Sequence, residues 1–157
     1  MPTTPQTADR SKARRGFTLT ELMIVTVIIG IMAAMSVPSF RRAVEQSRAD
    51  VAVANLRAIW AAERLFWLEN HMYTPTPATA LQNLQNLGLV DKEIVSGTGG
   101  YTYSVPSTTA TTFTATATNA SGLGSFSINE AGDVSGSVTL GAYRITSGLQ
   151  WTSSSSP

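Results

Sequence analysis

The chain of 157 residues contains no cysteine and only one histidine, His71. The absence of cysteine excludes disulfides, thiolate metal sites and a cysteine nucleophile, and a single histidine excludes a metal site built on two. Charged residues make up only 13% of the chain, about half of the usual share. The fold must therefore be held by its apolar core, by neighbouring molecules in an assembly, or by both.

The sequence also lacks the motifs of common catalytic sites, such as a glycine-rich phosphate loop, a nucleophile elbow or a cluster of metal ligands. We expect His71 to lie at a helix C-terminus, near the negative end of the helix dipole. Glu130 and Asp133, in "NEAGDVSG", are typical of a hairpin turn rather than of a metal site. No enzymatic activity, cofactor or metal is expected.

Positive charge is concentrated at the N-terminus. Residues 1–16 hold four basic residues and one acidic residue, whereas the remainder holds seven basic and nine acidic residues. The leader is thus +3 and the rest of the chain −2. Nucleic-acid binding needs clustered basic residues to neutralise phosphates, so the composition argues against a sequence-wide attraction to nucleic acid, and no nucleic-acid partner is predicted from it.

A long apolar segment follows the basic leader. No charge occurs between Glu21 and Arg41, a distance of about 28 Å in a helix and close to the roughly 30 Å of a bilayer core. Residues 17–40 are therefore predicted to form a transmembrane helix, with the basic leader in the cytoplasm. A secretory signal is the alternative, but the run is longer than the usual 7–15 residues and "MAAMS" is a weak cleavage site.

The helix is predicted to continue to about residue 70, since residues 41–70 contain no glycine or proline. Apolar residues recur there at three- and four-residue steps and predict a stripe that packs on a sheet and is broken at Glu63. The stripe consists of Ala49, Ala52, Val53, Leu56, Ile59, Trp60, Phe66 and Trp67. Pro38 lies inside the combined helix and predicts a bend or a weak point.

Beyond the helix, a loop over 71–99 is expected, with a short amphipathic stretch ended by Gly88. Period-two alternation between turn signals then predicts four or five antiparallel strands over 100–146, followed by a loose tail over 147–157. The predicted fold class is α+β. A long helix packs on a small antiparallel sheet, and residues 41–157 form an extracytoplasmic head.

The stretch "RRGFTLTELMIVTVIIG" resembles the N-terminal signature of type IV pilins and pseudopilins. In that signature, basic residues and a glycine precede a phenylalanine, and a glutamate follows four positions later. Here these residues are Gly16, Phe17 and Glu21, and Gly30 and Pro38 also fall at family positions of the anchor helix. A weaker resemblance extends through the helix end, the loop and the later strands.

The resemblance implies that a prepilin peptidase cuts between Gly16 and Phe17 and that Phe17 is then N-methylated. The product would be a structural subunit of a type IV pilus, held as a single-pass protein in the inner membrane, in contact with lipid. An inner-membrane assembly machinery would then polymerise it into a homo-oligomeric helical filament at the cell surface. The alternative within the family is a pseudopilin or minor pilin of a type II secretion or DNA-uptake system.

Glu21 has a physical role in this picture. A lone carboxylate at the edge of the bilayer costs roughly up to 3 kcal/mol. The α-amine exposed at Phe17 of a neighbouring subunit would neutralise it, which makes Glu21 a device that sets the stagger between subunits. The alternative is a glutamate that snorkels to the interface without a partner.

Gly30 and Pro38 together weaken the helix between them. The family pattern implies local unwinding of this segment in the filament, and the alternative is a static kink. Many pilins close a C-terminal loop with a disulfide, which this chain cannot form.

A membrane-tethered binding module is a second class of function, with adhesion or DNA capture carried by the sheet. In this class, exposed Tyr101 and Tyr103 with Arg144 would contact the ligand. Tyrosines at alternating strand positions more often pack on one face of the sheet. "NAS" at Asn119 matches the acceptor triplet for N-glycosylation, but the signal is common by chance, and we expect neither Asn119 nor the serine tail to be modified.

Overall fold

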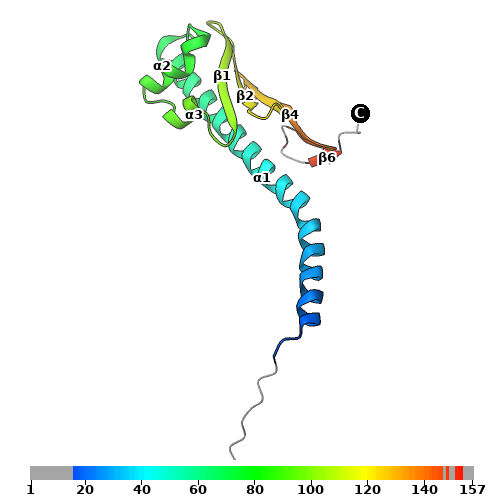
Figure 1. The fold of residues 1–157 in the computed structure, drawn as a ribbon. Helices are drawn as coiled ribbons and strands as arrows, with labels where there is room; N and C mark the ends of the chain where they lie inside the picture. Colours follow the sequence, from blue (N-terminus) through cyan, green and yellow to red (C-terminus); the bar gives the residue numbers. More distant parts are fainter. Residues whose placement is uncertain (1–15, 147, 149–150, 154–157) are drawn as a thin grey trace, which may run out of the picture. The chain divides into compact units, whose positions relative to one another are not determined.

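The computed structural model of the protein describes residues 16–146, 148 and 151–153. A long helix is followed by short helices and an antiparallel sheet, which confirms the expected α+β class (Figure 1). Contacts divide the chain into two units, the first ending at Ser39 and the second, here called the head, beginning at Phe40. The elements are α1 (Leu19–Asn70), η1 (Pro77–Thr79), α2 (Ala80–Asn86), α3 (Lys92–Ser96), β1 (Tyr101–Thr108), β2 (Phe113–Asn119), β3 (Gly124–Asn129), β4 (Val134–Leu140), β5 (Tyr143–Thr146) and β6 (Trp151–Ser153).

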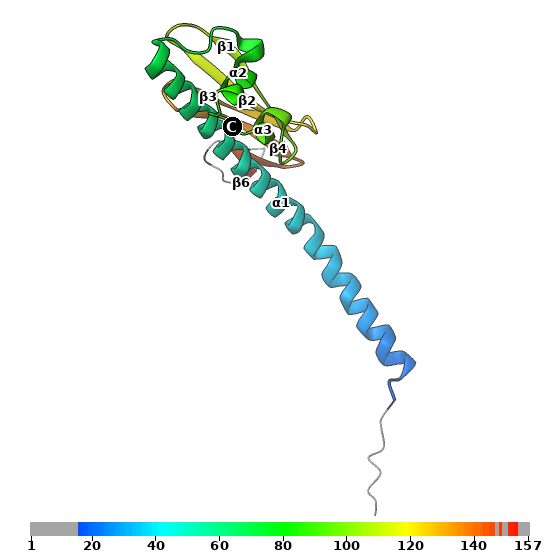
Figure 2. The same cartoon turned by 90° about the vertical axis from the view of Figure 1, so that its left-hand side faces the viewer.

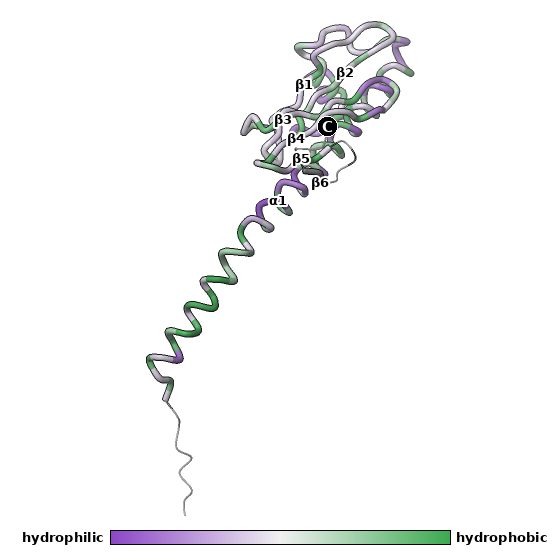
Figure 3. The backbone as a smooth tube through the Cα atoms, turned by 90° about the vertical axis from the view of Figure 1, so that its right-hand side faces the viewer, coloured by the Kyte–Doolittle hydropathy of each residue, from purple (hydrophilic) through white to green (hydrophobic). Residues whose placement is uncertain are grey.

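The N-terminal part of α1 is exposed. All residues from 16 to 41 are exposed, and most of the residues between Leu22 and Phe40 are hydrophobic (Figure 3). The helix begins at Leu19, two residues later than expected, and runs through Pro38 without ending. Apolar side chains on every side of a helix indicate that lipid or other protein surrounds it.

The C-terminal part of α1 packs on the sheet, as the apolar stripe predicted (Figures 1 and 2). Ala49, Leu56 and Ile59 are fully buried, and Trp60 packs against the same core. The expectation that Glu63 breaks the stripe is wrong. Glu63 is itself fully buried, because a polar partner in the following loop satisfies its carboxylate.

The connection over 71–99 contains more helix and less loop than expected. α2 confirms the amphipathic stretch, with Leu81 and Leu84 buried, and Gly88 follows it with a φ of +73°. η1 and α3 were not anticipated, since helices of three and five residues are too short to produce a periodic pattern. These short helices lie beside β1 and bury Ile94 in the core.

The six strands lie in the sheet in sequence order, and each is antiparallel to its neighbours. Alternation is clearest in β1, where Tyr101, Tyr103 and Val105 are buried and the residues between them are exposed. Five strands lie within 100–146, as expected. The sixth, β6, pairs with β5 inside the range expected to be a loose tail, because three residues are too few to show alternation in a sequence. Residues 154–157 lie outside the described residues.

The core of the head fills the space between the C-terminal part of α1 and one face of the sheet. Tyr73, in the connection, packs against Phe113 with 4.8 Å between ring centroids and the rings tilted by 53°. Trp60 donates a hydrogen bond to the carbonyl oxygen of Glu130 over 3.0 Å, which ties α1 to the β3–β4 turn. The head is thus held by apolar packing and a few buried polar contacts in place of disulfides.

Candidate functional site

The residues of the expected cleavage site are accessible. Gly16, Phe17 and Thr18 precede the helix and are exposed, and Phe17 is 76% exposed. No atom lies within 4 Å of the position that a Cβ of Gly16 would occupy. An exposed, non-helical backbone suits entry into a protease cleft. Residues 1–15, the rest of the expected leader, lie outside the described residues.

Glu21 forms a reciprocal hydrogen-bonded pair with Thr18 at the start of α1. Oε2 of Glu21 accepts from the backbone N–H of Thr18 over 2.9 Å and from its hydroxyl over 2.7 Å. The backbone N–H of Glu21 in turn donates to Oγ1 of Thr18 over 3.2 Å. This is a capping box. It was not anticipated, although Thr-x-x-Glu in "TLTE" is its sequence signature.

The capping box uses only one oxygen of the Glu21 carboxylate. Both bonds from Thr18 end on Oε2, and among the described residues no donor lies on Oε1. A carboxylate has about four acceptor positions, so it can accept an amine while it caps its own helix. Glu21 is therefore suited to hold a second, cationic partner.

The apolar segment of α1 is long and apolar enough to cross a membrane, and no part of it is buried in the protein. Gly30 lies within this segment, and a Cβ there would meet no atom within 4 Å. Gly30 is therefore not required for packing inside this chain. Pro38 removes the backbone donor that the carbonyl of Ala34 would otherwise receive in the helix.

A buried carboxylate joins α1 to the first two strands. Glu45, 6% exposed, accepts a hydrogen bond from Nδ2 of Asn119 over 2.8 Å and a longer one from the Tyr101 hydroxyl over 3.5 Å. Its second oxygen lies 3.5 Å from Nη1 of Arg48. Burial raises the pKa of the Tyr101 phenol, which keeps it protonated and able to donate. These contacts fix the register of α1 on the sheet.

A second buried carboxylate joins α1 to the loop that follows it. Oε1 of Glu63 accepts from the Thr74 hydroxyl over 2.6 Å, and Oε2 accepts from the Thr74 backbone N–H over 3.1 Å. Burial raises the pKa of Glu63 above its ordinary value of 4.5, and the two bonds from Thr74 oppose that shift. The pair holds the chain where it turns back from the helix.

The suggested ligand site of Tyr101, Tyr103 and Arg144 is wrong. Both tyrosines are buried, at 1% and 7% exposure, and face α1. The hydroxyl of Tyr103 accepts a hydrogen bond from Asn55 over 2.9 Å. Arg144 lies on β5, four strands from β1 in the sheet. Packing on one face, the alternative for these tyrosines, is what the structure shows.

Three further sequence signals have structural roles. Asn119, in the glycosylation triplet, is 5% exposed, with its amide bonded to Glu45 and to the backbone of Ser121. Glu130 and Asp133 lie in the turn between β3 and β4, and the described residues hold no cluster of metal ligands. His71 follows the last residue of α1 with a φ of 55° and meets Trp67 edge to face.

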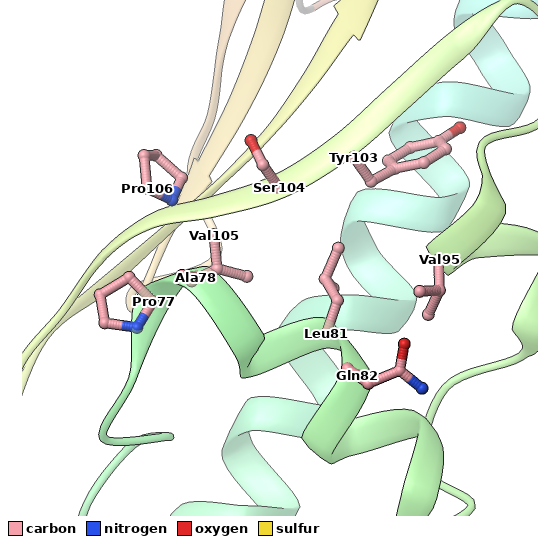
Figure 4. Close-up of a pocket in the computed structure, with 9 residues that line it drawn as sticks. All are labelled: Pro77, Ala78, Leu81, Gln82, Val95, Tyr103, Ser104, Val105 and Pro106. Carbon is pink, nitrogen blue, oxygen red and sulfur yellow. The ribbon is translucent and has the colours of Figure 1, made fainter.

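A hollow lies between the short helices and β1 (Figure 4). It has a volume of about 540 Å³ and is lined mostly by apolar side chains, with the two prolines Pro77 and Pro106 at one end. Gln82 and Ser104 are the polar side chains that line it, and no charged residue does. The hollow is therefore unsuited to an anion such as a nucleic-acid phosphate.

Two family models match adjacent parts of the chain. The model of the prokaryotic N-terminal methylation motif matches residues 11–37. The model described as type IV minor pilin ComP, DNA uptake sequence receptor, matches residues 38–130. The first match covers the expected cleavage site and Glu21, and the second covers the head as far as the β3–β4 turn.

Individual relatives match only part of the chain. The chain is 45% identical over 60 residues to the type IV major pilin protein PilA of Myxococcus xanthus, a match that covers 38% of this chain and 27% of PilA. It is 40% identical over 65 residues to the type II secretion system core protein G of Pseudomonas aeruginosa, covering 41% of this chain and 46% of that protein. A fimbrial protein of P. aeruginosa is 33% identical over 88 residues, or 56% of each chain.

The chain thus spans between about a quarter and about half of the length of these relatives. All three carry the names of pilus, fimbrial or secretion-system proteins. The ComP model by itself covers more than half of the chain. Together with the capped apolar helix and the sheet-bearing head, this match shows that the protein belongs to the type IV pilin family.

Proposed function

We propose that the protein is a structural subunit of a type IV pilus, polymerised through the N-terminal part of α1. The observation that carries this proposal is the exposed apolar segment, which no part of the described chain covers. Such a surface is stable only in lipid or against other apolar helices. An assembly of many such helices supplies the second environment, and the membrane supplies the first.

Processing and assembly are coupled in this proposal. Cleavage between Gly16 and Phe17 by a prepilin peptidase creates an α-amine, which is N-methylated and remains cationic. This amine, on a subunit already in the filament or on the one arriving, pairs with the free Oε1 of Glu21 in a water-poor helical core. The attraction of opposite charges is much stronger there than in water. An inner-membrane machinery supplies the work of extraction, and the finished fibre lies at the cell surface.

The test is the variant Glu21→Gln, which keeps the shape of the side chain and one acceptor oxygen but removes the charge. We expect normal removal of the leader and a loss of surface filament of about tenfold or more. Processing is read from the mass of the mature N-terminus, and filament from sheared surface protein. Glu69→Gln, at the exposed C-terminal end of α1, is the matched control, because it removes the same charge outside the assembly segment. Normal filament yield from Glu21→Gln with normal processing would contradict the proposal.

A pseudopilin or minor pilin is the second candidate, and the comparisons favour it specifically. The matching head model is that of a minor pilin, and protein G of the type II secretion system is among the relatives. The two candidates differ in abundance. A major pilin makes up most of the fibre, so its deletion removes fibres from electron micrographs. A minor subunit is found at a small fraction of the major one in sheared material.

DNA uptake is the specific activity that the head model's description suggests. The charge of the matched region does not favour it, since residues 38–130 hold six basic and seven acidic residues. Non-specific DNA binding depends on neutralising phosphates. We therefore expect the full-length protein in detergent to cause no gel shift of duplex DNA at physiological salt. A sequence-dependent shift that persists as salt is raised would instead support the DNA-receptor role.

A further inference from the structure

We propose that a groove at the start of the head binds the phosphate headgroup of an anionic phospholipid in the outer leaflet of the inner membrane. The inference rests on the proposed membrane insertion of residues 17–40 and adds a specific lipid contact to it. The groove belongs entirely to the head and lies between the first turns of α1 in the head, the β2–β3 turn and the end of β4.

The groove combines an apolar floor with cationic walls. It has a volume of about 330 Å³, and its apolar lining includes Phe40, Val44, Leu123 and Leu140. Phe40 is 70% exposed, whereas Val44, Leu123 and Leu140 are half-buried. Arg41 and Arg48 also line the groove. A phospholipid presents the same two features, a phosphate joined to an acyl chain.

The two arginines are available for an anion. They are seven residues apart, which places them about two helical turns from each other on one face of α1. Arg41 is exposed and makes no ion pair among the described residues. Arg48 keeps about half of its side chain in solvent while one nitrogen reaches Glu45 over 3.5 Å. Guanidinium groups bind phosphate through two parallel hydrogen bonds, which suits both positions.

Glu45 also lines the groove, but both oxygens of its carboxylate already have partners in the head. Asn119 and Tyr101 donate to one of its oxygens, and Arg48 faces the other. Arg42, which is not among the lining residues, lies over the ring of Tyr143 at 4.4 Å. Residues 41–48 hold three arginines and one acidic residue, so the local charge balance is positive.

The position along the chain identifies the membrane as the source of the phosphate. Arg41 is the first charged residue after the apolar segment, so it lies at the level of the headgroups when that segment spans the bilayer. Phe40, one residue earlier, also lines the groove and adds an exposed apolar side chain to it. A free phosphate would use only the arginines. A second copy of the chain would need to bring acidic residues to a surface that faces the lipid.

The experiment uses the full-length protein in non-ionic detergent with added phosphatidylglycerol, phosphatidylcholine or soluble glycerol phosphate. Native mass spectrometry measures the fraction of protein that retains each molecule. We expect retention of phosphatidylglycerol to exceed that of phosphatidylcholine by about fivefold or more, and Arg41→Gln/Arg48→Gln to abolish this preference. Arg57→Gln/Lys92→Gln is the matched control, because it removes the same charge from exposed or distant positions outside the groove. The control is expected to retain the preference.

Three results would overturn the proposal. Equal retention of the two lipids, or an equal loss in the control pair, shows that no headgroup site exists in this groove. Competition by glycerol phosphate as strong as that by the lipid identifies a soluble anion as the ligand. Dimers that depend on Arg41 without lipid retention identify a second copy as the occupant.

Two further variants keep the result interpretable. Arg41→Gln alone removes an exposed side chain with no described ion pair, and it is expected to fold and to lower the preference by about threefold or more. Glu21→Gln separates the two proposals, since it is expected to abolish filaments and leave lipid retention unchanged. Loss of lipid preference in Glu21→Gln would count against the groove, whatever the filament assay shows.

Discussion

At the scale of single residues, α1 places three carboxylates in three different environments. Glu21 lies on the exposed apolar segment and caps its own helix. Glu45 and Glu63 are buried in the head and are bonded mainly by neutral donors from the sheet and the connecting loop. The buried pair fixes the position of α1, whereas Glu21 retains an oxygen for another molecule. The same residue type therefore serves packing in the head and, in the function proposed above, assembly outside it.

The raised pKa of Glu63 predicts a pH dependence of stability. Because burial raises the pKa of folded Glu63 above 4.5, the folded chain binds this proton more tightly than the unfolded chain. The stability that this group contributes is fully present below pH 4.5 and is lost as pH rises through the folded pKa. Glu63→Gln mimics the protonated form, and its amide and carbonyl can bond to the Thr74 hydroxyl and N–H. We expect the free energy of unfolding of Glu63→Gln to lie within about 1 kcal/mol of that of wild type near pH 4.5.

As pH rises, the melting temperature of Glu63→Gln is expected to increase relative to that of wild type. Thermal melts of the full-length protein in detergent between pH 4.5 and 7.5 measure this difference. Glu69→Gln, an exposed change of the same type in the same helix, serves as the control and should show no such trend. A constant difference between Glu63→Gln and wild type across the pH range would argue against the burial effect.

At the scale of elements, the β3–β4 hairpin depends on glycine. Gly124 and Gly136 both have positive φ, at +140° and +105°, and each faces the backbone of the partner strand so closely that a Cβ would collide with it. A Cβ on Gly136 would meet the carbonyl oxygen of Ser125, and one on Gly124 would meet that of Ser137. The close approach is part of the ladder that pairs Ser125 with Ser137 and Phe126 with Gly136.

Gly136→Ala is therefore expected to destabilise the head by about 2–4 kcal/mol, through both backbone strain and overpacking. Gly141→Ala is the matched control. Gly141 has a φ of +61°, but a Cβ there would meet nothing within 4 Å, so only the strain of about 1 kcal/mol applies. Thermal or chemical unfolding of the two variants measures the difference. Equal losses at the two positions would show that the close approach in the hairpin is unimportant.

The sequence predicts the long elements well and the short ones poorly. The 52-residue α1 and the alternating strands carry strong periodic signals, and both are present. α3 and β6 are too short to produce a period, and their existence depends on contacts with the rest of the head. The burial of Glu63 was hidden for a different reason, because its partner Thr74 lies eleven residues away beyond the end of the helix.

The residues of the candidate site also differ in how well the sequence predicts them. The motif around Gly16, Phe17 and Glu21 is local, so its residues and spacing are visible in the sequence. The capping bond from Thr18 to Glu21 is also local and was predictable from Thr-x-x-Glu. The lipid groove is not local, since Arg41 and Leu123 are brought together only when the sheet packs on α1.

At the scale of the whole molecule, the two parts of α1 meet different conditions. The head part packs on the sheet, whereas all residues from Gly30 to Pro38 are exposed. Gly30 costs about 1 kcal/mol and Pro38 about 3 kcal/mol of helix stability relative to alanine. Any softness of the anchor is therefore expected between these two residues rather than at the junction with the head.

Gly30→Ala/Pro38→Ala should remove this softness. We expect amide hydrogen exchange in the segment between positions 30 and 38 of assembled filaments to slow by about tenfold or more, since the opening of the helix becomes less favourable. Exchange in the sheet provides the internal control and should not change. Unaltered exchange between these positions would favour a static kink over local unwinding.

The capping box at the start of α1 has a consequence for the order of events at the membrane. Thr18 and Glu21 both lie after the proposed cut, so the shortened chain keeps the bonds that close its first helical turn. After such a cleavage the N-terminal end of the helix would already be ordered, and the new amine on Phe17 would lie four residues before a carboxylate that is oriented in advance. Docking of the next molecule would not have to pay the entropy of ordering that end.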